Sequence, residues 1–164
     1  MRRNNAEVPP QYPHAPLWRR FAAMFYDSLL VIALVMVTTG IYMAVAGAVM
    51  GTDALKTHLD TGGMSRDPFY KTILFLAIFF FFSYFWRRLG QTLGMQVWRI
   101  RVQNADGSGI SWTQCILRFM VAIVSWLCLG LGFFWMLWDK DRLTWHDRYS
   151  ESQVVLLPPK AKTK

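Results

Sequence analysis

Charge is missing from long stretches of this sequence. Only 17% of the residues are charged, whereas 54% are hydrophobic, a balance that soluble globular proteins rarely have. The run from Ser28 to Thr52 contains 25 residues and no charge. About 20 apolar residues suffice to cross a hydrocarbon core of about 30 Å. The sequence therefore predicts a membrane protein whose first span covers about residues 19–50.

Motifs of the common enzyme classes are also missing. The sequence has no Walker A run, no H-E-x-x-H and no G-x-S-x-G, which serve phosphate binding, zinc-dependent proteolysis and serine hydrolysis. Its three histidines lie in separate regions, and its two cysteines, Cys115 and Cys128, match no metal or redox spacing. We therefore expect a protein that is not an enzyme and that has no metal site and no cofactor.

Acidic residues are few. There are 10 of them against 18 Lys and Arg, which gives a formal net charge of +8. No basic array with interleaved stacking aromatics lies outside the apolar segments, so we expect no nucleic acid partner. In a membrane protein the same excess favours anionic lipid head groups at the inner face. The expected partners are the lipid bilayer, those head groups, and either a second copy of the chain or another membrane protein.

Proline is scarce except in residues 1–16, which hold four of the seven prolines. That composition predicts a disordered cytoplasmic tail. A membrane domain is predicted over residues 17–157, followed by a basic tail over residues 158–164. Residues 51–68 are expected to form a loop whose charges nearly cancel.

A second span is predicted at about residues 69–87. Asp67-Pro68 is a typical helix start, with Asp as N-cap and Pro in the first turn. Ten of the 18 residues from Phe69 to Trp86 are aromatic, and only Lys71 is charged. The first two spans are therefore expected to form a transmembrane helical hairpin.

The segment after the second span is basic. From residue 87 to residue 118 it contains only one acidic residue, Asp106, and five arginines: Arg87, Arg88, Arg99, Arg101 and Arg118. Positively charged loops stay on the cytoplasmic side, so we expect a multi-pass protein of the bacterial inner membrane with a cytoplasmic N-terminus. Within this segment, apolar and polar residues alternate from Trp98 to Gln103, which is typical of a strand.

A third apolar helical element is predicted at about residues 112–138. Gly130 and Gly132 interrupt it, and a single straight span would place the basic tail outside. The strand-like run from Gln153 to Leu157 can pair with Trp98–Val102 only if both lie on the same side of the membrane. We favour a broken or re-entrant element over a straight third span. The predicted fold class is an all-α membrane protein, a helical hairpin plus this element, with a short β-like cytoplasmic segment.

One carboxylate, Asp27, lies inside the first span. A carboxylate at the centre of a span costs about 2.5–3.5 kcal/mol on insertion scales, so such a residue usually has a partner. Arg20 precedes it by seven residues and shares one helical face, about 10 Å away along the axis. We expect Arg20 to be that partner.

Four pieces of the sequence, in this order, together resemble the RDD family of small membrane proteins. They are Arg19-Arg20-Phe21-Ala22-Ala23 with Asp27, then Gly90-Gln91-Thr92-Leu93-Gly94, then Arg99-Ile100-Arg101-Val102, then Trp145-His146-Asp147-Arg148. The resemblance covers about residues 18–155. It implies that the arginine and the two aspartates of the family name correspond to Arg20, Asp27 and Asp147.

One position departs from the family pattern. The residue after the second glycine is often basic in the family and is Met95 here. If that basic side chain binds an anion or a lipid head group elsewhere in the family, this chain does so with Arg99 or Arg101, or not at all.

The candidate site is therefore an ion-pair or transport site made of Arg20, Asp27 and Asp147. Secondary candidates are Arg19, Gly90, Gly94, Arg99, Arg101 and His146. The resemblance implies no settled activity, although transport of unidentified ligands has been suggested for the family. We expect a non-catalytic accessory, scaffold or assembly role in the membrane. The alternative is transport of protons, monovalent cations or another small ligand through an oligomer that uses Asp27.

Overall fold

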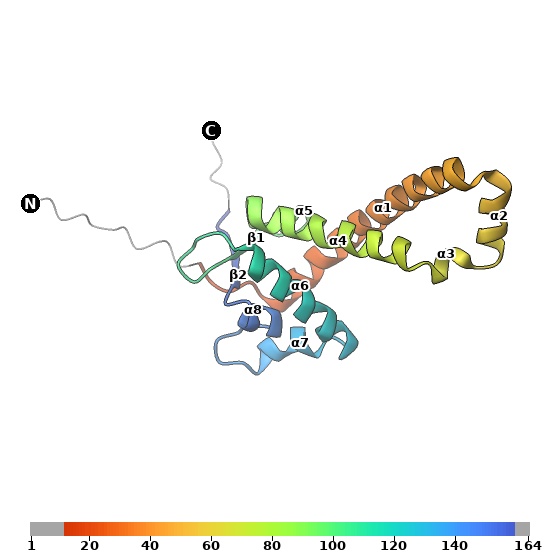
Figure 1. Ribbon diagram of the computed structural model, residues 1–164. Helices are drawn as coiled ribbons and strands as arrows, with labels where there is room; N and C mark the ends of the chain where they lie inside the picture. The colour runs from red at the N-terminus through yellow and green to blue at the C-terminus, as the bar shows by residue number, and fades with distance from the viewer. Residues whose placement is uncertain (1–11, 160–164) are drawn as a thin grey trace, which may run out of the picture.

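The computed structural model describes residues 12–159, which form a long helical hairpin joined at one end to a smaller bundle (Figure 1). The elements in chain order are α1 (Leu17–Met50), α2 (Thr52–Asp60), α3 (Gly63–Arg66), α4 (Pro68–Leu89), α5 (Leu93–Val97), β1 (Ile100–Gln103), α6 (Trp112–Leu127), α7 (Leu131–Phe134), the 3₁₀ turn η1 (Trp135–Leu137), α8 (Trp145–Tyr149) and β2 (Gln153–Leu156). The predicted class, an all-α membrane protein with a small β segment, is confirmed.

Helices α1 and α4 form the hairpin. The 34 residues of α1 correspond to a length of about 51 Å at 1.5 Å per residue, more than a hydrocarbon core needs. Helix α4 has 22 residues, and the Asp67 side chain caps it by accepting hydrogen bonds from the amides of Phe69 and Tyr70. Both helices are long and apolar enough to cross a membrane. They correspond to the predicted spans at about residues 19–50 and 69–87.

The connection between the two spans differs from the expected loop. Residues 51–68 contain the short helices α2 and α3. Gly51 and Gly62 adopt positive φ angles of 87° and 68°, which glycine accommodates without strain. The segment between these two glycines contains good helix formers such as Ala54 and Leu55. Gly51 and Gly62, which suggested a loop, therefore lie just outside α2, whereas charged residues such as Asp53 and Lys56 lie within it.

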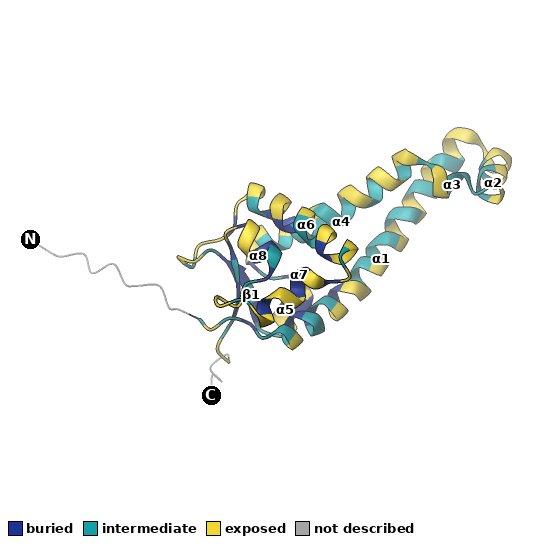
Figure 2. Ribbon diagram, turned by 90° about the horizontal axis from the view of Figure 1, so that it is seen from below, coloured by how far each residue is buried: buried dark blue, intermediate teal, exposed yellow. Residues whose placement is uncertain are grey.

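Burial along the hairpin is the reverse of burial in a soluble protein. Helix α1 buries only Arg20, Ala23 and Asp27, whereas Met36 is 70% exposed and Val49 is 78% exposed. Figure 2 shows that the buried residues gather in the bundle and not along the hairpin. Apolar surface of this extent needs lipid to cover it, because monomeric soluble proteins rarely expose large apolar patches.

The third apolar element is broken, as predicted. Helix α6 begins with a capping box formed by Ser111 and Gln114, and it is bent by 109° from the α7–η1 segment that follows. Leu129 and Gly130 adopt positive φ angles of 55° and 79°, which a continuing right-handed helix does not allow. The pair is either one bent span or a re-entrant element.

Strands β1 and β2 pair antiparallel, with Ile100 opposite Leu156, which confirms the predicted pairing. Pro13–Ala15 lies along the other edge of β2, because the Ala15 amide donates to the Val154 carbonyl and the Leu156 amide donates to the Pro13 carbonyl. These three residues belong to the predicted tail of residues 1–16. Residues 1–11 of that tail, and residues 160–164 of the predicted tail 158–164, lie outside the described residues.

Candidate functional site

Asp147 lies fully buried between two arginines from distant parts of the chain. Arg20 Nη1 is 2.5 Å from Asp147 Oδ2, and Arg118 Nη1 is 2.8 Å from Asp147 Oδ1. The two arginines are 4% and 3% exposed. We call these three residues the Asp147 cluster. Its two guanidinium groups and one carboxylate leave one positive charge without a carboxylate inside the cluster.

The local structure of α8 orients Asp147. Thr144 is the N-cap of this helix, and its hydroxyl accepts a hydrogen bond from the Asp147 amide, while the Thr144 amide donates back to the Asp147 carboxylate. Such a capping box satisfies two amides that a helix start leaves free. The carboxylate is therefore held at the start of α8, where the two guanidinium groups reach it.

The two arginines also bind the backbone and side chains around the sheet. Arg20 Nε donates to the Ala15 carbonyl at 3.1 Å, and Nη2 donates to the Val154 carbonyl at 3.4 Å. Arg118 Nη1 donates to Ser152 Oγ at 2.5 Å. The cluster thus joins α1, α6 and α8 to β2 and to the segment before α1.

Burial and the two arginines determine the charges at neutral pH. Burial alone would raise the pKa of the Asp147 carboxyl, but Arg20 and Arg118 outweigh it and hold that pKa well below its usual range. Burial lowers the pKa of the neighbouring His146 to about 3. Asp147 is therefore a fixed anion and His146 is neutral, so neither group exchanges protons near pH 7.

Asp27 forms a separate site with α5. Its carboxylate accepts a hydrogen bond from Thr92 Oγ1 at 2.5 Å and from the Gly94 amide at 2.9 Å, and the residue is 5% exposed. The predicted pairing of Asp27 with Arg20 is wrong, because Arg20 donates to Asp147 and to the backbone near β2.

Gly94 explains how α5 approaches so closely. A Cβ atom at this position would lie 2.3 Å from the Ala23 carbonyl oxygen and 2.8 Å from Asp27 Oδ1. Only a residue without a side chain lets the α5 backbone reach the carboxylate.

The secondary candidates lie in three places. Gly94 contacts Asp27, and His146 precedes Asp147 in α8. The others, Arg19, Gly90, Arg99 and Arg101, lie in or near β1. Arg19 Nη1 donates to the Trp98 carbonyl at 3.2 Å. Gly90 ends α4 with a φ of 67°, and a Cβ there would lie 2.8 Å from Arg101 Nε. Arg99 adopts a positive φ of 54° and is half-buried.

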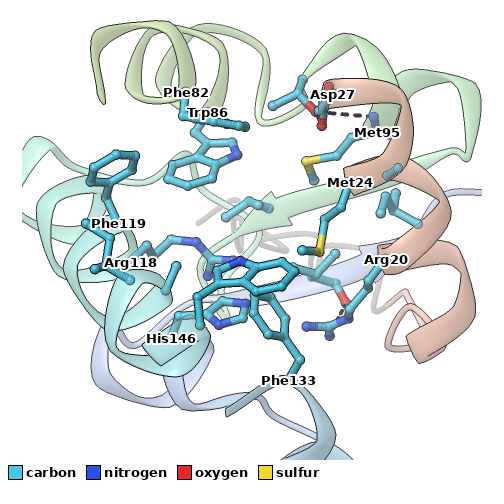
Figure 3. Close-up of a pocket in the computed structure, with 18 residues that line it drawn as sticks. Arg20, Met24, Asp27, Phe82, Trp86, Met95, Arg118, Phe119, Phe133 and His146 are labelled. Carbon is cyan, nitrogen blue, oxygen red and sulfur yellow. Dashed lines mark hydrogen bonds between the residues drawn. The ribbon is translucent and has the colours of Figure 1, made fainter. Parts of the chain in front are cut away.

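A cavity of about 240 Å³ lies next to the cluster, between α1, α4, α6 and α8. Figure 3 shows its lining, with Asp27 on one side of the opening and Arg118, Arg20 and His146 on the other. Met95, at the position where the family often has a basic residue, is 7% exposed and lines the cavity. This part of the lining is therefore apolar in this chain.

The model of the RDD family matches residues 14–151, most of the chain. The chain belongs to the RDD family. The matched region contains the arginine and both aspartates discussed above, so this RDD protein carries them in two separate hydrogen-bonded sites. Comparison with curated proteins gave no match, and neither did comparison with solved structures.

Two residues of the site were not among the predicted candidates. Arg118 is the only charged residue in α6, and a lone charge in an apolar helix is the signal that could have identified it. Thr92 lies inside the Gly90–Gly94 piece that carried the resemblance. Across residues 12–159, no group of three or more His, Cys, Asp and Glu is placed to hold a metal ion.

Proposed function

We propose that this RDD protein is a non-catalytic accessory protein that scaffolds or assembles a partner protein in the bacterial inner membrane. The observation that carries the proposal is the buried Asp147 cluster, which joins three helices and the sheet into one unit at the end of the hairpin. Breaking such a buried pair is strongly destabilising, because it leaves an unpaired charge. Buried charges paired in this way hold the bundle in one conformation, and a docking surface for a partner protein requires such a fixed conformation.

The orientation of that unit is part of the proposal. Arg87 and Arg88 are exposed at the end of α4, on the same end of the hairpin as the sheet (Figure 1). Because positively charged segments stay on the cytoplasmic side, we place the bundle, and with it the partner surface, in the cytoplasm.

Site-specific photo-crosslinking in the native membrane tests the accessory role. A photoreactive residue is placed at exposed Ala105 or Tyr149 on the bundle, and at exposed Ala54 in α2 as the matched control. We expect one constant protein to be captured from the bundle positions and not from Ala54. Capture of nothing, or of unrelated abundant proteins from every position, would overturn the proposal.

Transport is the second candidate, and a specific observation favours it. Asp27 is buried, lines the cavity and has no ion-pair partner among residues 12–159. Carboxylates inside membrane spans often belong to proton or ion pathways. The test is proton and sodium flux into liposomes that contain the purified protein. Flux that Asp27→Asn abolishes would establish transport, whereas no flux in the wild type leaves the accessory role as the better account.

A further inference from the structure

The cavity beside the Asp147 cluster has the character of a hydrocarbon site. Its walls are dominated by large apolar side chains, among them Phe82, Trp86, Phe119, Ile123, Trp126 and Phe133. Its volume of about 240 Å³ exceeds the roughly 150 Å³ of an apolar protein cavity that stays dry and binds benzene. An apolar chain is therefore a better occupant for these walls than water.

Part of the cavity wall is exposed on the outer surface of the protein. Ile123 and Trp126 line the cavity and are still 37% and 62% exposed. Both lie on α6, in the third apolar helical element. Trp126 and Ala122 follow Arg118 at intervals of four residues, so the three share one face of the helix. A chain that enters beside Trp126 would pass Ala122 and end at Arg118.

Arg118 lines this cavity and has a hydrogen-bonding atom without a partner among the described residues. Both of its hydrogen bonds leave from Nη1, to Asp147 and to Ser152, and its buried Nε has no partner within the described chain. Figure 3 shows the guanidinium directed toward the centre of the ring of lining side chains. His146 also lines the cavity, and its buried Nδ1 has no partner in residues 12–159. The cluster as a whole has one more guanidinium group than carboxylate.

We propose that the cavity binds a long-chain fatty acid, with its carboxylate on Arg118 and His146 and its acyl chain along α6. A carboxylate has two oxygens that match the Nε–Nη2 edge of a guanidinium, and a neutral imidazole can donate from Nδ1. Asp27 lines the far side of the cavity, where Thr92 and Gly94 already satisfy it. Its carboxylate would repel a second one there, so the acid lies with its head at Arg118. This site does not depend on the accessory role.

Photolabelling of the full chain in phosphatidylcholine nanodiscs tests the proposal. Three probes carry the same diazirine acyl chain: the free fatty acid, its methyl ester and a phosphatidylglycerol. Adducts are located by mass spectrometry, with oleate as competitor. We expect the acid to label the cavity lining about tenfold more than the ester, as one charge-assisted hydrogen bond would give. Oleate should remove that labelling.

Two variants supply the matched comparison. Ala122→Phe places a large side chain in the cavity while the three residues of the cluster stay unchanged. It should reduce labelling of the lining at least about fivefold, since little space would remain. Ala44→Phe, at an exposed position of α1, should leave it unchanged. Equal labelling by acid and ester overturns the proposal, and so does cavity labelling by the phosphatidylglycerol at the level of the acid. These results need no variant, and they leave the crosslinking experiment on the partner unaffected.

Discussion

Arg20 and Asp147 are 127 positions apart in the chain, and their side chains meet at 2.5 Å between Nη1 and Oδ2. Arg118 binds the second oxygen of the same carboxylate. The first turns of the first span are thereby tied to a short helix near the end of the chain. The arginine and the second aspartate of the family pattern form one buried structural unit, and the first aspartate belongs to a different one.

Asp147→Asn should destabilise the protein severely. The variant removes the anion and leaves two buried guanidinium groups without it, and breaking buried ion pairs in this way costs about 3–5 kcal/mol. The measurement is the free energy of unfolding in mixed micelles, followed by circular dichroism. Asp141→Asn is the control, since Asp141 binds Arg148 with a side chain that is 70% exposed, and it should change little. Similar losses in both variants would contradict the account.

Gly94→Ala should separate α5 from α1. Its Cβ would have to occupy space 2.3 Å from the Ala23 carbonyl oxygen, which is backbone and cannot move aside easily. We expect a loss of at least about 2 kcal/mol, comparable to overpacking a core. Gly40→Ala is the matched control, because a Cβ there meets nothing within 4 Å; it should be neutral or slightly stabilising. The check is thermal stability of both variants in detergent.

The sheet requires both of its strands to lie on one side of the membrane. Cysteine labelling with an impermeant maleimide tests this after Cys115 and Cys128 are replaced by alanine. Three exposed positions are used. Ala105 follows β1 and Pro158 follows β2, whereas Ala54 lies in α2 at the far end of the hairpin. We expect Ala105→Cys and Pro158→Cys to react from one side and Ala54→Cys from the other. Labelling of the first two from opposite sides would refute the fold.

Acid should destabilise the protein partly through His146. Its pKa is lowered from 6.5 to about 3, first by burial and also by Arg118 and Arg20, with Asp147 opposing the shift. Below pH 6.5 the His146 imidazole then binds a proton in the unfolded chain but not in the folded chain. The free energy of unfolding therefore falls as the pH falls toward 3. The slope reaches up to about 1.4 kcal/mol per pH unit.

The variant His146→Phe isolates this contribution. His146 packs against Phe133 with ring centroids 4.8 Å apart, so a phenyl ring keeps the aromatic contact and loses the titrating group. Between pH 7 and pH 4, the free energy of unfolding of the variant should fall less steeply with falling pH than that of the wild type. An unchanged slope would mean that His146 does not carry the acid sensitivity.

Local patterns explain which parts of the fold the sequence predicts. Three such patterns are the uncharged run after Asp27, the Asp67-Pro68 start of α4 and the alternation around β1. Each occupies one continuous stretch of the chain, so it is visible in the sequence. The partner of Arg20 is not visible there, because helical spacing identifies neighbours on the same helix only. Asp27 was the nearest acid on that face, yet packing brings Asp147 to the arginine and Thr92 to Asp27.

The central claim is that Arg20 forms its ion pair with Asp147 and not with Asp27. A double-mutant cycle tests this claim most directly. The free energy of unfolding in micelles is measured for Arg20→Met, Asp147→Asn, Asp27→Asn and the two double variants that contain Arg20→Met. We predict a coupling of at least about 2 kcal/mol between Arg20 and Asp147, and less than about 0.5 kcal/mol between Arg20 and Asp27. A larger coupling between Arg20 and Asp27 would contradict the account.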